Sequence, residues 1–239
     1  MMRNPIKVLR KVYEMRWVLR SLPWTIYFNL HFLPFKQAIK LPIFLYKPRF
    51  GKLTGKIEIH AEHIKPGMIR LGKFQVSLYP NTGIYIHNEG RIIFEGKALI
   101  GNNSFLSIGK TGTLKIGNAL LASTTLRLTS YHRIDIGENG RIGWDCLFMD
   151  TNFHKLRKED GTFSKGYAPI IIGKNNWIAN GCRILSRTKT PDFCIISAGT
   201  IVNTTVNAPE HSIIGNPRTF EILKTGIWRD LDNDTIEYE

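Results

Sequence analysis

The stretch CLFMDTNFHKLRKEDGTFSKGYAPIIIG, from Cys146 to Gly173, gathers side chains that can take part in proton transfer. His154 lies in its segment DTNFHKL, shortly after Asp150 and Asn152. An imidazole titrates near neutral pH, so it can remove the proton of a hydroxyl group while that oxygen attacks another molecule. A carboxylate or an amide beside the ring can hold it in position, and Asp150 and Asn152 are both candidates for that role.

Regular segments with a six-residue period flank this stretch. Aliphatic or aromatic side chains recur at this interval in three runs: Ile108, Leu114, Leu120 and Leu126; Ile136, Ile142 and Phe148; Ile172, Ile178, Ile184, Ile196 and Val202, with Thr190 as the one exception. This period fits neither an α-helix nor a meander. It predicts an all-β solenoid whose short strands each place one side chain inward. Residues 150–169 are then predicted to form a loop that leaves a corner of the solenoid.

The chain divides into three parts by composition. Residues 1–51 predict a basic amphipathic helix near the N-terminus, limited by Pro23, and then an aromatic segment. Residues 52–217 carry the β-type repeats, and residues 218–239 form a C-terminal helix or tail. Residues 1–50 can lie on an anionic membrane surface or pack on the protein itself or a neighbouring subunit, and the sequence leaves both open. The apolar region 22–46 is too interrupted by charged residues and prolines to span a membrane.

The charge of the chain indicates an anionic partner. Its 33 Lys and Arg residues against 19 Asp and Glu residues give a formal net charge of +14. This charge suits nucleic acid, an anionic membrane surface or a phosphorylated small molecule, but no nucleic-acid-binding motif is found, so nucleic acid is not expected. The three cysteines form no CxxC motif and no secretory signal is apparent, which favours a cytoplasmic protein.

Three segments resemble the hexapeptide-repeat acyltransferases: IIIGKNNWIANGCRIL (170–185), IISAGTIV (195–202) and APEHSIIGNPRTFEIL (208–223). The N-terminal SLPWTIYFNLHFLPFKQAIKLPI is similar to the lead-in of capsule and surface-polysaccharide O-acetyltransferases in that family. The resemblance implies a left-handed parallel β-helix with triangular coils, assembled as a homotrimer. It also implies transfer of an acetyl group from acetyl-CoA to a sugar hydroxyl of a surface polysaccharide or its precursor, without a metal.

The resemblance assigns roles to particular residues. His154 matches the catalytic histidine at the start of the family's loop and would act as general base, with Asp150 or Asn152 orienting it. The pantetheine arm and adenine end of acetyl-CoA would lie along a set of residues on neighbouring coils: Trp177, Ala179, Asn180, Ser197, Ala198, Gly199, Asn216, Pro217 and Arg218. A basic residue that the family carries after the IGAG coil is missing from VNTT (202–205), and Lys189, Arg218 and Lys224 are the predicted substitutes. Tyr131, His132 and Asp145 are predicted to contact the acceptor.

Several alternatives stay open at this point. If each coil has 18 residues, His132 lies beneath Asp150, and Asp150 can bind His132 instead of His154. An N-acyltransferase that acts on a nucleotide-linked amino sugar shares the fold and the cofactor, because one histidine does not distinguish an amine from a hydroxyl. A metal enzyme of the carbonic anhydrase type is disfavoured, because the histidines lack the spacing of converging ligands.

Overall fold

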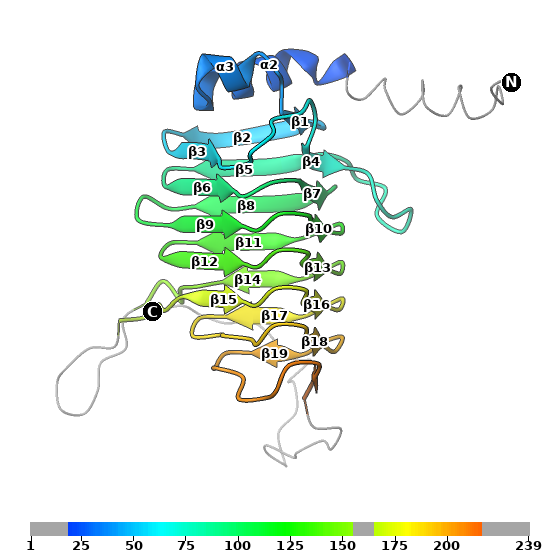
Figure 1. Cartoon of the computed structure of the whole chain (residues 1–239), viewed down its shortest axis with the longest axis vertical. Helices are drawn as coiled ribbons and strands as arrows, with labels where there is room; N and C mark the ends of the chain where they lie inside the picture. The colour runs from blue at the N-terminus through cyan, green and yellow to red at the C-terminus, as the bar shows by residue number, and fades with distance from the viewer. Residues whose placement is uncertain (1–18, 155–164, 217–239) are drawn as a thin grey trace, which may run out of the picture.

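The structure is a computed structural model that describes residues 19–154 and 165–216. Its strands form three parallel sheets (Figure 1). Sheet A contains β1 (Ile43–Leu45), β4 (Ile69–Lys73), β7 (Ala98–Gly101), β10 (Leu120–Ala122), β13 (Arg141–Ile142), β16 (Trp177–Ile178), β18 (Ile195–Ile196) and β20 (Ile213–Ile214). Sheet B contains β2 (Pro48–Leu53), β5 (Ile84–Asn88), β8 (Ser104–Ile108), β11 (Arg127–Ser130), β14 (Leu147–Met149), β17 (Arg183–Leu185) and β19 (Ile201–Val202). Sheet C contains β3 (Lys56–Ile59), β6 (Arg91–Phe94), β9 (Thr113–Ile116), β12 (Arg133–Ile136) and β15 (Ile170–Ile172).

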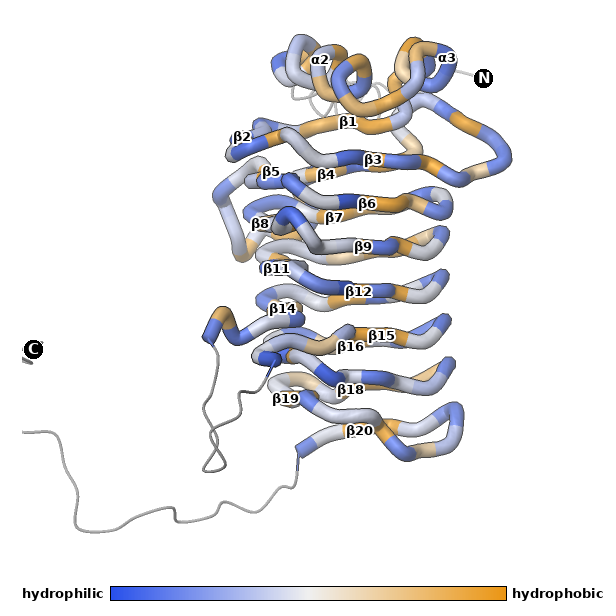
Figure 2. The backbone as a smooth tube through the Cα atoms, turned by 90° about the vertical axis from the view of Figure 1, so that its left-hand side faces the viewer, coloured by the Kyte–Doolittle hydropathy of each residue, from blue (hydrophilic) through white to orange (hydrophobic). Residues whose placement is uncertain are grey.

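The chain visits sheets A, B and C in turn, so each coil has three sides and three corners. We name the corners A/B, B/C and C/A after the sheets that they join. The coils stack into a column (Figure 2). Its core is one continuous cluster of buried hydrophobic side chains, most of them aliphatic. All positions of the six-residue period are buried, including Thr190 at 8% exposure. The predicted all-β solenoid, a left-handed parallel β-helix, is confirmed.

The coils are not all 18 residues long. Trp177 pairs with Ile195, 18 positions later, but Arg127 pairs with Leu147, 20 positions later. The longer coil arises because β12 places two side chains, Ile134 and Ile136, in the core instead of one. Ser130, and not His132, therefore lies beneath Asp150, and the stacking predicted from an 18-residue coil is wrong at this point.

The long excursion after β14 does not disturb the column. Leu147 pairs with Arg183, 36 positions later, which is twice the 18-residue offset of the following coils. The chain thus leaves at the B/C corner and returns to the ladder in register. Residues 155–164 of the predicted loop lie outside the described residues.

Two helices, α2 (Leu22–Phe32) and α3 (Phe35–Ala38), cover the N-terminal end of the column (Figures 1 and 2). Pro23 stands in the first turn of α2, where its missing N–H costs nothing. The helical residues Leu19 and Arg20 stop at the turn at Ser21, which agrees with the limit predicted at Pro23. The amphipathic helix predicted near the N-terminus falls mostly within residues 1–18, which are not described. Within the described residues, no helix is both long and apolar enough to cross a membrane.

The side chains of α2 complete the hydrogen bonds of the first strand. The Asn29 carboxamide donates to the Ile43 carbonyl at 2.8 Å and accepts from the Ile43 N–H at 3.1 Å. The Thr25 hydroxyl accepts from the Leu45 N–H at 3.2 Å. Asn29 and Thr25 are fully buried, and they satisfy backbone groups of β1 that a preceding coil would otherwise pair. The column therefore starts at β1, earlier than the predicted boundary at residue 52, and the predicted tail 218–239 lies outside the described residues.

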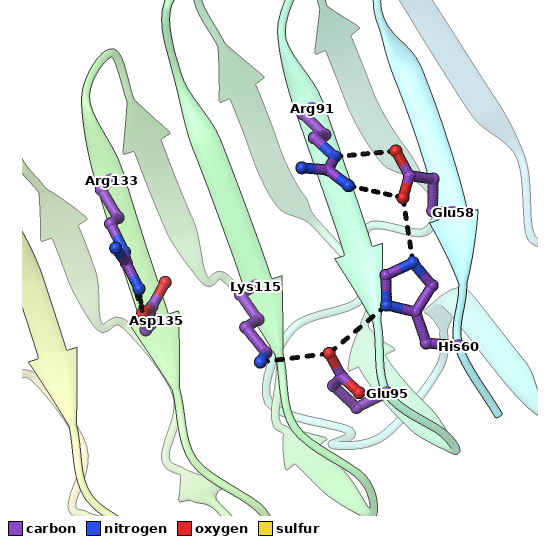
Figure 3. Close-up of polar contacts among 7 residues, drawn as sticks. All are labelled: Glu58, His60, Arg91, Glu95, Lys115, Arg133 and Asp135. Carbon is purple, nitrogen blue, oxygen red and sulfur yellow. Dashed lines mark hydrogen bonds and ion pairs between the residues drawn. The ribbon is translucent and has the colours of Figure 1, made fainter.

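Carboxylates are unevenly distributed over the three faces. Figure 3 shows a network of ion pairs on sheet C. The Nε and Nη2 atoms of Arg91 each donate a hydrogen bond to Glu58 at 2.7 Å, and His60 lies 2.9 Å from Glu58 and 3.6 Å from Glu95. The strands of sheets A and B carry no Asp or Glu, whereas those of sheet B carry Arg49, Lys52, Arg127 and Arg183.

Candidate active site

The ends of the loop that carries His154 are held together at the B/C corner. Thr151 and Tyr167 form an antiparallel bridge, and the Asn152 N–H donates to the Gly166 carbonyl at 2.9 Å. Gly166 has φ +70°, and a Cβ there would lie 2.4 Å from the His154 carbonyl oxygen. Only glycine fits this approach without strain, so the position of His154 depends on a residue across the loop.

Two aromatic contacts join the loop to the coil beneath it. The rings of Tyr131 and Phe153 lie 5.0 Å apart, edge to face. The rings of His132 and Tyr167 lie 4.9 Å apart. Both Tyr131 and His132, predicted to contact the acceptor, are thus brought to the same corner as His154.

Among the described residues, no hydrogen bond joins the Asp150 side chain to His154. Asp150 is fully buried, and its Oδ2 accepts hydrogen bonds from the Ser130 hydroxyl and the His132 N–H, both at 2.9 Å. Its Oδ1 accepts from the Tyr131 N–H at 2.8 Å. Both oxygens are therefore occupied by the turn of the coil below. Asp150 binds the backbone of His132 rather than either imidazole, which neither of the two sequence-based alternatives described.

Asn152 contacts the backbone of His154. Its Oδ1 accepts a hydrogen bond from the His154 N–H at 3.2 Å, in a short turn that fixes the main chain. Within residues 19–154 and 165–216, no hydrogen bond to the His154 imidazole is found, and the side chain is exposed. The ring can therefore approach a ligand or another protein chain that packs on this corner.

The residues predicted to bind acetyl-CoA gather along the A/B corner of the last coils. The Ala179 N–H donates to the Ile196 carbonyl at 2.9 Å, and the Gly199 N–H donates to the Asn180 carbonyl at 2.9 Å, so these turns stack directly. Trp177 stands beside them on β16, with half of its surface exposed at 52%. Ser197, Ala198 and Asn216 follow β18 and β20 at the same corner. Pro217, Arg218 and Lys224 lie outside the described residues.

Lys189 lies apart from this set. It pairs with Ile171 and Thr205 in isolated bridges and therefore continues sheet C, on the far side of the B/C corner. Within one chain, the structure does not bring Lys189 to the predicted cofactor residues.

One polar contact at the A/B corner was not predicted. The Tyr79 hydroxyl donates to Oδ2 of Asp145, 66 positions away in sequence, and this hydrogen bond raises the pKa of Tyr79 above its usual range. Tyr79 belongs to the segment 74–83, which leaves β4 and projects beside the later coils (Figure 1). No repeat or motif signals a contact between an excursion and a corner so far apart. Asp145, predicted to contact the acceptor, thus lies at the A/B corner and not beside His154 of the same chain.

The thiols and potential metal ligands form no further centre within the described residues. Cys146, Cys182 and Cys194 are buried and free, and a hydrogen bond with Cys182, together with burial, raises the pKa of the Cys146 thiol. No group of three or more His, Cys, Asp or Glu side chains in the described part of the chain is placed to hold a metal ion.

Comparison with known proteins gives limited matches. No family model matches the chain. A Klebsiella pneumoniae protein described as an uncharacterized 24.8 kDa protein in the cps region is 27% identical over 95 residues, which are 40% of this chain and 41% of that protein. The chain thus aligns with about two fifths of the length of this curated relative.

Three solved structures show similarity to the chain. They are the polySia-specific acetyltransferase NeuO (16% identity, 80% of each chain, TM-score 0.42), the polysialic acid O-acetyltransferase OatWY (13%, 76% of this chain and 80% of that chain, TM-score 0.34) and a maltose O-acetyltransferase from Clostridium difficile 630 (13%, 84% of this chain and 81% of that chain, TM-score 0.24). At these TM-scores they support no functional conclusion for this chain. The six-residue repeats, parallel sheets and three-sided coils of the chain itself show the fold, a left-handed parallel β-helix.

Proposed function

We propose that this protein is an acetyltransferase that moves an acetyl group from acetyl-CoA to a sugar hydroxyl of a surface polysaccharide or its precursor. The observation that carries this proposal is the grouping of the predicted residues at two corners. Ala179, Asn180 and the segment 197–199 stack at the A/B corner, and His154 lies with Tyr131 and His132 at the B/C corner. No feature of the repeat itself requires an exposed histidine and an exposed tryptophan at these places.

In the proposed reaction, His154 acts as general base without a covalent acyl-enzyme. The imidazole takes the proton of the sugar hydroxyl while its oxygen attacks the thioester carbonyl. The carbon–sulfur bond then breaks, and the departing thiolate takes up the proton from the imidazolium, which gives free coenzyme A and returns His154 to its neutral form. Backbone N–H groups near the thioester would stabilise the negative oxygen of the intermediate.

An active site that combines residues of the A/B corner with His154 of the B/C corner must be formed by two chains. β14 has three residues, and at about 3.3 Å per residue sheet B holds its two corners roughly 10–15 Å apart. His154 of one chain and the A/B corner of the same chain therefore face different sides of the column. We propose a homotrimer in which the B/C corner of one subunit meets the A/B corner of the next, since a cyclic assembly repeats this contact three times.

The same arrangement gives Lys189 a role. Because Lys189 lies on sheet C beside the B/C corner, it would approach the A/B corner of the neighbouring subunit rather than its own. Its ammonium group would then compensate phosphate charge of acetyl-CoA bound there, as Arg218 and Lys224 are predicted to do.

We also propose a cytoplasmic location, where acetyl-CoA is available and thiols stay reduced, with contact to the membrane surface. The helical cap exposes Trp24, Tyr27, Leu30, Phe35 and Ile39. The sequence holds no Asp or Glu between Glu14 and Glu58, so the cap is cationic as well as apolar. This combination suits an anionic lipid surface.

The proposal is tested by incubating the purified protein with acetyl-CoA and a panel of sugar acceptors, with mass spectrometry of the products. His154→Ala is expected to lower transfer by roughly 10²–10⁴-fold and to leave coenzyme A binding nearly unchanged. Acetylation of an amino sugar on nitrogen instead of oxygen would favour the N-acyltransferase. Full activity of His154→Ala would overturn the role of His154.

A further inference from the structure

A groove of about 730 Å³ lies at the N-terminal part of the A/B corner, a few strands before the residues predicted to bind acetyl-CoA. Its walls come from the start of α2, the turn before β2, the segment 80–83 and the outer face of sheet B at β5 and β8. The volume falls within the ~300–1,000 Å³ that ligand sites usually have.

Aromatic side chains line this groove. The rings of Tyr85 and Phe105 lie side by side, 6.1 Å apart, on the outer face of sheet B. Trp24 faces the same groove from α2 and contacts Phe50 edge to face at 5.9 Å. Phe105 and Trp24 keep 46% and 52% of their surface exposed, so their faces are open to a ligand. Such faces pack well against the C–H side of a pyranose ring.

The groove is also cationic. Among the residues that the structure describes, Arg20, Lys47 and Arg49 line it, and no Asp or Glu does. No ion pair to Arg49 is found within the described residues, and its guanidinium can bind a carboxylate or a phosphate through two parallel hydrogen bonds. The carboxylates carried by strands all lie on sheet C, where they are paired (Figure 3). Glu89, which follows β5, pairs with Lys52 and His87 and does not line the groove.

The wall formed by the segment 74–83 is held in one conformation. Asn102 is fully buried, and its carboxamide donates to the carbonyls of Tyr79 at 3.0 Å and Asn81 at 2.7 Å while accepting from the Gln75 N–H at 3.0 Å. At the end of the segment, Gly83 has φ +102°, and a Cβ there would lie 2.2 Å from the Lys47 carbonyl oxygen. The groove is therefore a preformed feature of the fold.

The groove and the predicted cofactor residues share one corner. From the N-terminal end, the A/B corner carries the groove, then Asp145 with its bond to Tyr79, and then Asn180 and the segment 197–199. β8 and β14 are separated only by β11, so the groove ends about 10 Å along the column from the level of His154, at ~4.8 Å per strand. An extended polymer lying in the groove would pass the level at which the acetyl group is transferred.

We propose that this groove binds a segment of an acidic polysaccharide, with aromatic rings against the sugars and Arg49 on their carboxylate or phosphate groups. Asn81 and Thr82 at its edge supply amide and hydroxyl groups for the sugar hydroxyls. This mixture of polar groups with three cations favours a glycan over nucleic acid, which requires a denser array of cations along its backbone. That the bound chain is the acceptor rests on the function proposed above, whereas the binding itself does not.

The test is a calorimetric titration of the full chain, without acetyl-CoA, with an oligosaccharide of uronic or sialic acids and with its carboxyl-reduced, neutral counterpart. The acidic oligosaccharide is expected to bind, and the neutral one to bind at least tenfold more weakly. Arg49→Gln and Phe105→Ala are each expected to weaken binding of the acidic oligosaccharide by roughly five- to tenfold. Both positions are exposed, so the variants should keep the circular dichroism spectrum and melting temperature of the parent.

Two substitutions remote from the groove serve as matched controls. Lys97→Gln removes the same charge at the C/A corner, and Phe193→Ala removes an aromatic ring with similar exposure, 44%. Both should leave binding unchanged. Equal binding of the acidic and neutral oligosaccharides, unchanged binding by Arg49→Gln, or tighter binding of a single-stranded oligonucleotide of equal charge would overturn the proposal.

The outcome is separable from the test of the proposed function. His154→Ala is expected to bind the acidic oligosaccharide as the parent does, because His154 does not line the groove. Binding with no acetyl transfer would uphold the groove and count against the enzyme. Transfer to short acceptors without binding of the acidic oligosaccharide would uphold the enzyme and count against the groove.

Discussion

The Oδ2 atom of Asp150 accepts a hydrogen bond from the backbone N–H of His132 at 2.9 Å, and among the described residues neither the His132 nor the His154 imidazole is found hydrogen-bonded to this side chain. The carboxylate thus caps the turn at residues 130–132 and is part of the support for the loop rather than of the reacting groups. Asp150 and Asn152, the two residues predicted to orient His154, can therefore be told apart by the effects of replacing them.

Asp150→Ala is expected to lower the free energy of unfolding by about 3 kcal/mol, because it leaves the buried Ser130 hydroxyl and two partly buried N–H groups without an acceptor. Asp150→Asn keeps one acceptor oxygen and should cost less. Urea denaturation at neutral pH measures both. The folded fraction of each variant should retain the parent's pH dependence of kcat. An Asp150→Asn protein with parental stability, a hundredfold lower kcat and a shifted pH profile would instead show that Asp150 orients His154.

A site built from two chains predicts complementation between inactive variants. Ala198 is exposed at the A/B corner, so Ala198→Trp should block the cofactor groove without disturbing the core. Ala198→Trp and His154→Ala are each expected to be inactive. Trimers reassembled from equal amounts of both should regain about a quarter of the parental activity, because some interfaces then combine an intact histidine with an intact groove.

The control for complementation is a mixture in which one chain carries both substitutions and the other carries none, measured by light scattering and by activity. Sites formed within one chain would give no recovery from the two single variants. A monomeric mass in solution would also contradict the proposed assembly.

The ion pairs of sheet C predict a pH-dependent contribution to stability. The hydrogen bonds from Arg91 lower the pKa of Glu58 from its ordinary value of 4.5 to about 2. The stabilisation by the charged carboxylate is therefore complete above pH 4.5 and is lost as the pH falls toward 2. Because the pair is partly exposed, the difference in unfolding free energy between the parent and Glu58→Gln should be about 1 kcal/mol or less at pH 7.

Urea titrations at pH 7, 4 and 3 check this contribution, with Lys97→Gln as a control on an exposed residue at the C/A corner. The difference between parent and Glu58→Gln should shrink from pH 4 to pH 3. A difference that stays constant over this range would show that the substitution acts through packing and not through the charge of Glu58.

The helical cap predicts binding to anionic membranes. Leu30 and Phe35 are exposed at 51% and 70%, and neither lines the groove described above. Leu30→Ser combined with Phe35→Ser should weaken binding to vesicles of phosphatidylglycerol by tenfold or more, since each side chain contributes roughly 1.5–3 kcal/mol when buried in lipid. Flotation with anionic and with zwitterionic vesicles measures the effect. Equal binding of the parent and the double variant would indicate that the cap packs on protein instead.

The six-residue period was sufficient to predict the solenoid, because each inward position reports directly on the core. Ile172, Ile178 and Ile184 recur without a gap, and each lies where the period places it. The same reasoning failed between Leu128 and Phe148, because Ile134 and Ile136 both point inward and lengthen that coil by two residues. A pattern of aliphatic residues does not distinguish a strand with two inward positions from a shifted register.

The candidate site was predictable only where neighbouring coils repeat a motif. The turns at Asn180 and Gly199 follow the same pattern and therefore stack as expected. The bond from Tyr79 to Asp145 and the capture of Asp150 by the turn below depend on how an excursion and a longer coil fall in space. Such contacts join residues with no shared periodicity, so they require the three-dimensional arrangement.

The polar side chains of α2 also limit how copies of this column can associate. A stack of parallel coils exposes an unpaired strand edge at each end, and identical edges can join copies into a filament. The side chains of Asn29 and Thr25 form hydrogen bonds with the backbone of β1, so residues of the same chain close one of these edges. Copies cannot pair through that end while the cap stays in place, so the hydrogen bonds of α2 set a limit on the growth of the β-sheet from one molecule to the next.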